Sequence, residues 1–74
     1  MVKAKVTSVI HKKDGFRLLV IRNCPFCGHK HTHGGGPIGD DIRLWGGSRY
    51  SHCWKVPSKL YELVIPEDVA YDHK

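Results

Sequence analysis

Apolar and polar residues alternate along the first part of the chain, and this pattern predicts a β-hairpin. One side of residues 2–10 carries Val2, Ala4, Val6, Ser8 and Ile10. A period of two is typical of a half-buried strand. The pair Asp14-Gly15 follows and is a strong signal for a tight turn, because both residue types tolerate positive φ. Residues 16–22 are mostly apolar and β-prone, so residues 1–22 are expected to form an N-terminal hairpin.

The remaining pattern predicts short strands separated by glycine-rich turns. Residues 34–39 contain four glycines and a proline, which predicts a loop. A phosphate-binding loop is disfavoured because no Gly-Lys-Ser/Thr sequence and no dinucleotide fingerprint is present. Residues 42–45 and 48–56 predict two strands joined by a hairpin turn at 46–47. Residues 60–65 predict a strand, with a short helix as the alternative, and the last eight residues are expected to fray.

The length and cysteine content of the chain indicate a domain that needs a disulfide or a bound metal ion for stability. A chain of 74 residues is expected to form one domain whose core alone gives marginal stability. Three cysteines cannot all pair within the chain, so a metal site in a reducing compartment is favoured over a disulfide scaffold. No apolar run approaches the roughly 20 residues of a membrane span, and the N-terminus lacks a signal-peptide pattern. A cytoplasmic (intracellular) protein with no membrane partner is therefore expected.

The segment from Cys24 to Gly28 is the strongest chemical signal in the chain. Two thiolates separated by two residues can hold one zinc ion, and Gly28 lets the chain bend past the second sulfur. A redox pair is the alternative, but that chemistry is typical of a Cys-x-x-Cys at a helix start in a βαβ setting. Here the motif follows a predicted strand and precedes a glycine-rich segment. The pattern favours a metal site.

The other two ligands must come from later in the chain. Cys53 is the third expected ligand, because a Cys-x-x-Cys pair needs partners and this is the remaining cysteine. For the fourth, His33 ranks first, His31 second and His52 third. Five residues between Cys27 and His33 leave room to loop back, whereas His52 adjoins Cys53 and in a regular strand would point to the opposite face. The predicted cofactor is one structural Zn²⁺ held by Cys24, Cys27, His33 and Cys53, with His31 and His52 as alternatives for the histidine.

These elements together predict a small mainly-β zinc-binding domain. Its expected parts are the N-terminal β-hairpin (1–22), a zinc-binding part resembling a zinc knuckle or ribbon-like β-meander (23–56), and a strand with an acidic tail (57–74). The motifs Cys24-Pro25-Phe26-Cys27, His31-Thr32-His33-Gly34, Gly47-Ser48-Arg49 and His52-Cys53 resemble a group of short uncharacterised proteins of actinobacteria and their phages. The resemblance covers residues 23–54 and implies zinc binding but no activity. The lysine- and isoleucine-rich composition suggests an archaeal or viral source.

Charge and aromatic residues favour nucleic acid as the partner. The chain carries a net charge of +5, with +7 in residues 1–55 and −2 in residues 56–74. A basic body indicates a polyanionic partner, and aromatic rings among basic residues suit single-stranded nucleic acid. The candidate contacts are Arg43, Trp45, Arg49, Tyr50 and Lys55. RNA or a ribonucleoprotein is favoured over an operator because no recognition helix is predicted.

Two other functions compete with nucleic-acid binding. A protein-interaction module, such as a phage or viral accessory factor that docks on a host protein, is the main alternative. An enzyme is disfavoured, because three sulfur ligands and one histidine would close the zinc coordination and a catalytic zinc keeps one position open. A Cys53–His52 nucleophile pair is formally conceivable, but the expected metal role consumes that cysteine.

Overall fold

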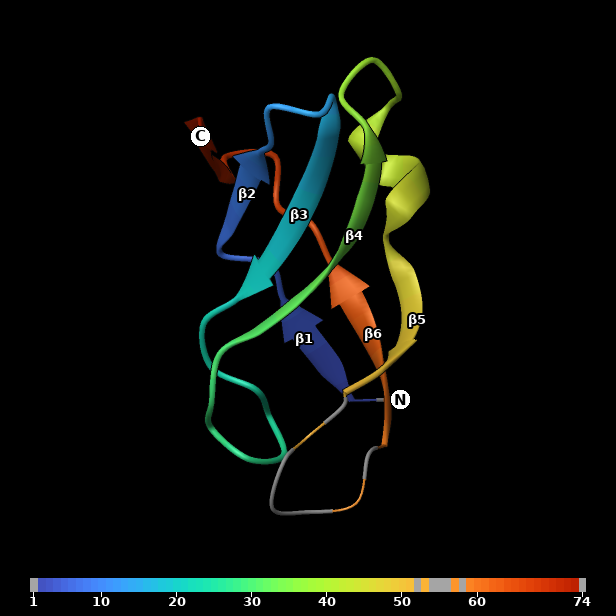
Figure 1. Cartoon of the computed structure of the whole chain (residues 1–74). Coiled ribbons are helices and arrows are strands. Elements are labelled where there is room, and N and C mark those ends of the chain that lie inside the picture. The colour runs from blue at the N-terminus through green and yellow to red at the C-terminus, as the bar shows by residue number, and fades with distance from the viewer. Residues whose placement is uncertain (1, 52, 54–56, 58, 74) are drawn as a thin grey trace.

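The chain folds into two β-sheets, as expected for a small mainly-β domain (Figure 1). The computed structural model describes residues 2–51, 53, 57 and 59–73. A four-stranded sheet has the order β4-β3-β2-β7, and a three-stranded sheet has the order β1-β6-β5. The elements are β1 (Lys3–Lys5), β2 (Ser8–His11), β3 (Phe16–Ile21), β4 (His31–Pro37), the 3₁₀ helix η1 (Ile42–Trp45), β5 (Gly47–Tyr50), β6 (Leu60–Val64) and β7 (Ala70–His73). Within the described residues, no helix has the length and apolar character needed to cross a membrane.

The predicted N-terminal hairpin is present as β2 and β3. The two strands pair antiparallel, with Ile10 opposite Leu18, and the Lys12 amide donates to the Phe16 carbonyl at 2.8 Å. The turn uses Gly15 at φ 90°. This positive φ is the reason that the sequence signal for the turn was reliable.

The expected single strand over residues 2–10 is wrong, because the chain divides there into β1 and β2. Val6 and Val9 are both fully buried, and an odd spacing between two core residues breaks the period of two. The chain bends between them and passes from one sheet into the other. Residues 60–73 follow the same route, since β6 runs parallel to β1 and β7 runs parallel to β2.

The expected loop at residues 34–39 is also wrong over most of its length. Gly34, Gly35 and Gly36 belong to β4, which pairs antiparallel with β3. A Cβ on Gly35 would lie 3.0 Å from Leu19 Cδ2, and a Cβ on Gly36, whose φ is +71°, would lie 2.1 Å from Trp45 Cε2. At Gly35 and Gly36, therefore, side chains pack directly on the strand backbone. The β3–β4 register also shifts between Phe16 and Leu18.

Residues 42–45 form η1 and not a strand, so the predicted hairpin turn at 46–47 is wrong as well. The Asp41 carboxylate caps the helix by accepting from the Arg43 amide at 3.0 Å. Three residues per turn place Ile42 and Trp45 on the same side, where both pack against the core. Of the predicted strand 48–56, the structure has β5 at Gly47–Tyr50; residues 52 and 54–56 lie outside the described part of the chain.

The C-terminal segment contains the predicted strand and one unexpected strand. Leu60–Val64 forms β6, which confirms the strand prediction over the helical alternative. The expectation that the last eight residues fray is wrong for Ala70–His73, because β7 pairs with β2 along its length. The core lies between the sheets and contains Ala4, Val6, Val9, Leu19, Ile21, Cys24, Tyr61, Leu63 and Val69.

Candidate metal centre

The first half of the site is a tight turn that follows β3 directly. Gly28 takes φ 78°, and its amide donates to the Cys24 carbonyl at 2.9 Å. The Phe26 amide points at the Cys24 sulfur, with a nitrogen-to-sulfur distance of 3.4 Å. The Cys24 amide in turn donates to the His29 carbonyl at 3.0 Å, which closes the loop on the far side. Local backbone bonds therefore shape the turn and hold the Cys24 sulfur, while the Cys27 sulfur contacts His31.

Four side chains converge at this turn from three separate parts of the chain. The ligand atoms of Cys24, Cys27, His31 and Cys53 all lie within 4.8 Å of one another. The Cys24 and Cys53 sulfurs are 3.6 Å apart, and the His31 Nε2 lies 3.3 Å from the Cys27 sulfur and 3.8 Å from the Cys53 sulfur. The three cysteines are free thiols, so no disulfide competes for them.

These distances match the edges of a tetrahedron around one zinc ion. Zinc–sulfur bonds of about 2.3 Å and zinc–nitrogen bonds of about 2.0–2.1 Å place two sulfurs about 3.8 Å apart and sulfur and nitrogen about 3.6 Å apart. The Cys24–Cys53, Cys27–His31 and Cys53–His31 separations of 3.3–3.8 Å lie close to these values, and the other pairs are within 4.8 Å. Three thiolates and one imidazole are a donor set typical of structural zinc. The cluster fits one structural Zn²⁺, as predicted.

The ranking of His33 above His31 is wrong, and the β3–β4 register explains why. His31 pairs with Ile21, the last residue of β3 before the cysteine turn, whereas His33 pairs with Leu19, two residues farther from the turn. Two strand residues span about 6.6 Å, so the two histidines share a face but differ in depth. His33 instead lies in the core with its Nε2 2.6 Å from the Tyr61 hydroxyl. His52, ranked third, lies outside the described residues.

Ser51 and Tyr61, which the sequence analysis did not single out, contact the cluster or the cysteine turn from the buried side. The fully buried Ser51 hydroxyl accepts from the Lys59 amide and lies 3.1 Å from the Cys53 sulfur, to which it can donate when that sulfur is a thiolate. The fully buried Tyr61 ring stacks on Phe26 of the cysteine turn at 5.9 Å. The alternation along β6 was a usable signal for Tyr61, but nothing in the sequence pattern distinguishes Ser51 from an ordinary loop serine.

Three ionisable side chains in and beside the cluster, those of Cys24, Cys53 and Tyr61, have shifted pKa values. Burial raises the pKa of Cys24, but the amides of Phe26 and Cys27 and the neighbouring thiols favour its thiolate, and the net pKa is lowered. The Ser51 hydroxyl lowers the pKa of Cys53, yet burial and the other two cysteines outweigh it and the net pKa is raised. Burial, followed by the charges of the three cysteines, raises the pKa of Tyr61 to about 12. The Tyr61 hydroxyl therefore stays neutral around pH 7.

Three of the five predicted nucleic-acid contacts bond or pack within the protein. Arg43 forms a two-point ion pair with the Asp41 carboxylate, and Arg49 donates to the carbonyls of Ser48 and Trp45. The Trp45 ring packs on Gly36 and on the core. Tyr50 is 60% exposed, and Lys55 lies outside the described residues.

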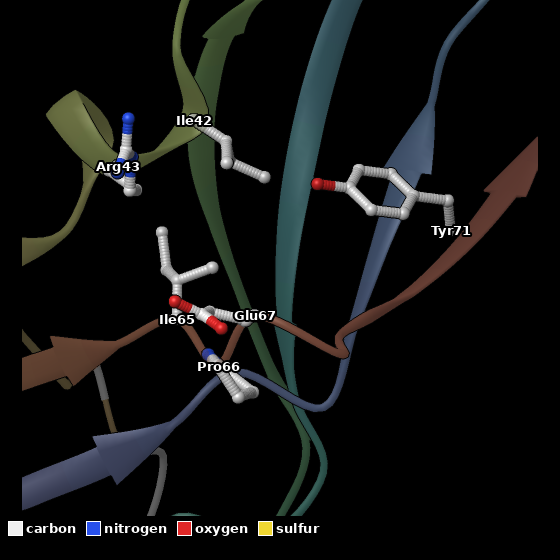
Figure 2. A pocket seen from close by; sticks show the side chains of 6 residues that line it. All are labelled: Ile42, Arg43, Ile65, Pro66, Glu67 and Tyr71. Carbon is white, nitrogen blue, oxygen red and sulfur yellow. The ribbon is translucent and has the colours of Figure 1, made fainter.

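A shallow hollow of about 250 Å³ lies away from the metal centre, between η1 and the segment that joins β6 to β7 (Figure 2). Its lining consists of Ile42, Arg43, Ile65, Pro66, Glu67 and Tyr71. Figure 2 shows the Tyr71 hydroxyl directed toward the side of the hollow formed by η1. None of the four cluster residues lines it, so the hollow and the metal centre are separate features.

Comparison with protein-family models, with curated proteins and with solved structures finds no match to this chain. The assignment of a zinc centre therefore rests on the convergence of Cys24, Cys27, His31 and Cys53 and on their distances.

Proposed function

We propose that this chain is a nucleic-acid-binding zinc module, with RNA or a ribonucleoprotein as the favoured partner. The observation that carries the proposal is the charge at the end of the molecule that holds the metal centre, called the zinc end below. Exposed lysine and arginine side chains lie at that end, and they are Lys3, Arg22, Lys30 and Lys59. None of them forms an ion pair with another described residue.

The acidic residues lie mostly at the other end of the molecule. Asp14 is in the β2–β3 turn, Asp40 and Asp41 precede η1, and Glu67 and Asp68 join β6 to β7 (Figure 1). The molecule is 33 Å long, whereas charges in physiological salt are screened over about 8 Å. A polyanion at the zinc end would therefore be attracted by the local lysines and arginine, with little repulsion from these distant carboxylates. Glu62, opposite Lys3 in the β1–β6 pairing, is the nearer acidic residue.

Zinc has a structural role in this proposal. Four protein ligands leave no open coordination position for a substrate or a water molecule. Three thiolates with one Zn²⁺ carry one negative charge, so the loaded chain is one unit less positive than its formal +5. The zinc end stays basic because its positive side chains outnumber that single charge.

The test is binding of fluorescent single-stranded and duplex RNA, followed by anisotropy over a series of salt concentrations. Each lost phosphate contact should flatten the slope of log affinity against log salt by about 0.7 for a single strand. Lys30→Gln and Lys59→Gln should each show this loss. Lys13→Gln is the matched control, because Lys13 is equally exposed but lies in the β2–β3 turn at the other end. No binding at low salt, or an equal effect of all three variants, would contradict the proposal.

A protein-interaction module is the second candidate. It would use the surface of η1, where Leu44 is 76% exposed and where the neighbouring Ile42 and Arg43 line the hollow of Figure 2. Binding that persists at high salt and is lost in Leu44→Ser would support this candidate in place of the first.

A further inference from the structure

The three-stranded sheet has one face that no described element covers. Side chains that alternate with the buried Ala4, Tyr61 and Leu63 point away from the core. We call this surface the open face, and its residues are Lys3 and Lys5 of β1, Leu60, Glu62 and Val64 of β6, and Ser48 and Tyr50 of β5.

An exposed aromatic ring lies on the open face at the margin nearest the zinc end. Tyr50 is directly opposite Leu60 in the β5–β6 ladder, and the two side chains are 60% and 42% exposed. Val64, farther along β6, is 38% exposed. A flat ring with an aliphatic neighbour offers a surface on which a nucleobase can stack without sequence-specific bonds.

The open face carries positive charge on its β1 edge and one negative charge on its central strand, β6. Lys3 and Lys5 lie on the edge strand β1, and neither forms an ion pair with a described residue. Glu62 lies on the central strand β6 between Lys3 and Ser48, and it would repel a phosphate placed there. Because adjacent strands are about 4.8 Å apart, the lysine edge and the Tyr50 edge are about 10 Å apart. Phosphates fit along β1 and bases fit toward β5.

We propose that the open face binds single-stranded nucleic acid, with one base stacked on Tyr50 and the phosphate backbone beside Lys3 and Lys5. This inference rests on the proposed function and adds the strandedness of the partner. A duplex keeps its base faces inside the stack, so the Tyr50 ring contributes only when bases are free.

The experiment compares zinc-loaded parent, Tyr50→Ala and Tyr50→Phe in binding to an unstructured RNA 12-mer and to an RNA duplex. Loss of one stacked base should weaken single-strand binding about tenfold in Tyr50→Ala, whereas Tyr50→Phe should bind like the parent. Duplex binding should change less than about twofold in both variants. A 2-aminopurine placed in the 12-mer should be quenched on binding to the parent and not on binding to Tyr50→Ala.

Phe16→Ala is the matched control, since Phe16 is a 51% exposed aromatic residue in the other sheet. It should bind the 12-mer as tightly as the parent. The stacking of a base on Tyr50 is wrong if the parent binds RNA but Tyr50→Ala loses no more affinity than Phe16→Ala. It is also wrong if Tyr50→Ala weakens duplex binding as much as single-strand binding. In both cases the proposal of nucleic-acid binding at the basic zinc end is unaffected. If the parent binds neither RNA, both proposals fail.

Discussion

The choice between His31 and His33 as the fourth zinc ligand gives the most direct test of the structure. His31→Ala removes an imidazole whose Nε2 lies 3.3 Å from the Cys27 sulfur and 3.8 Å from the Cys53 sulfur. His33→Ala removes an imidazole that lies in the core against the Tyr61 hydroxyl. The two histidines are two residues apart on the same strand, so each variant is the natural control for the other.

The two variants are expected to change different quantities: His31→Ala the affinity for zinc, and His33→Ala the free energy of unfolding. Binding of structural zinc at neutral pH is worth about 10–16 kcal/mol, so one ligand of four accounts for about 3 kcal/mol if the ligands share it equally. His31→Ala should therefore weaken zinc binding at least about 100-fold. His33→Ala leaves the buried Tyr61 hydroxyl without this partner and should lower the unfolding free energy by about 1–3 kcal/mol. Its zinc affinity should stay within about tenfold of the parent, because no ligand is lost.

The assay is native mass spectrometry of each variant with and without a strong chelator, together with zinc competition against a chromophoric chelator. The parent should carry one zinc per chain and unfold when the metal is removed, because folding and metal binding are coupled in small zinc domains. Cobalt substitution provides a second readout, since the visible spectrum reports whether a nitrogen ligand is present. Loss of zinc in His33→Ala with retention in His31→Ala would refute the register argument.

Three further predictions follow from the same structure. Cys24→Ser should leave the chain largely unfolded, which far-UV circular dichroism checks; an unchanged melting temperature would contradict the structural role of zinc. Tyr61 has its pKa raised from 10 to about 12, so its stabilising contribution is complete below pH 10 and is lost as the pH rises toward 12. The free energy of unfolding, measured with urea between pH 9 and 11, should therefore fall more steeply with rising pH in the parent than in Tyr61→Phe. Equal slopes in the two proteins would contradict the raised pKa of Tyr61. Gly36→Ala should cost about 2–4 kcal/mol, because its Cβ would overlap the Trp45 ring at a φ of +71°. Gly39→Ala, with no atom within 4 Å of the new Cβ, should cost little by the same denaturation measurement.

The hairpin and the cysteine turn were predictable because their signals are local. Asp14-Gly15 determines a turn through the positive φ of Gly15, and the strands on either side pair with each other. Residues 24–29 close the turn with their own backbone bonds, so the spacing of Cys24 and Cys27 is determined by the segment that contains them. The third cysteine followed from counting, because a pair of thiolates needs partners to complete a zinc site.

The fourth ligand was decided by pairing between distant residues. His31 and His33 share a face of β4, and alternation cannot distinguish two residues that point the same way. The pairing of His31 with Ile21 brings it beside the cysteine turn, and a register shifted by two residues would have brought His33 there instead. That register depends on which side chains the core accepts, which is a property of the assembled sheets.

Tertiary packing also overrode local propensity in the glycine-rich and apolar segments. Residues 34–36 read as a loop by composition, yet they form a strand because β3 pairs with their backbone and Trp45 packs where a Cβ would be. Residues 42–45 are predicted to form a strand by their hydrophobicity, yet they form the 3₁₀ helix η1. Asp41 caps this helix, and its three-residue turn places both Ile42 and Trp45 against the core. The sequence by itself determined the β class, the hairpin and the metal with its three sulfurs. The tertiary structure chose the histidine and the path of the chain between the two sheets, because both depend on contacts between residues far apart in the chain.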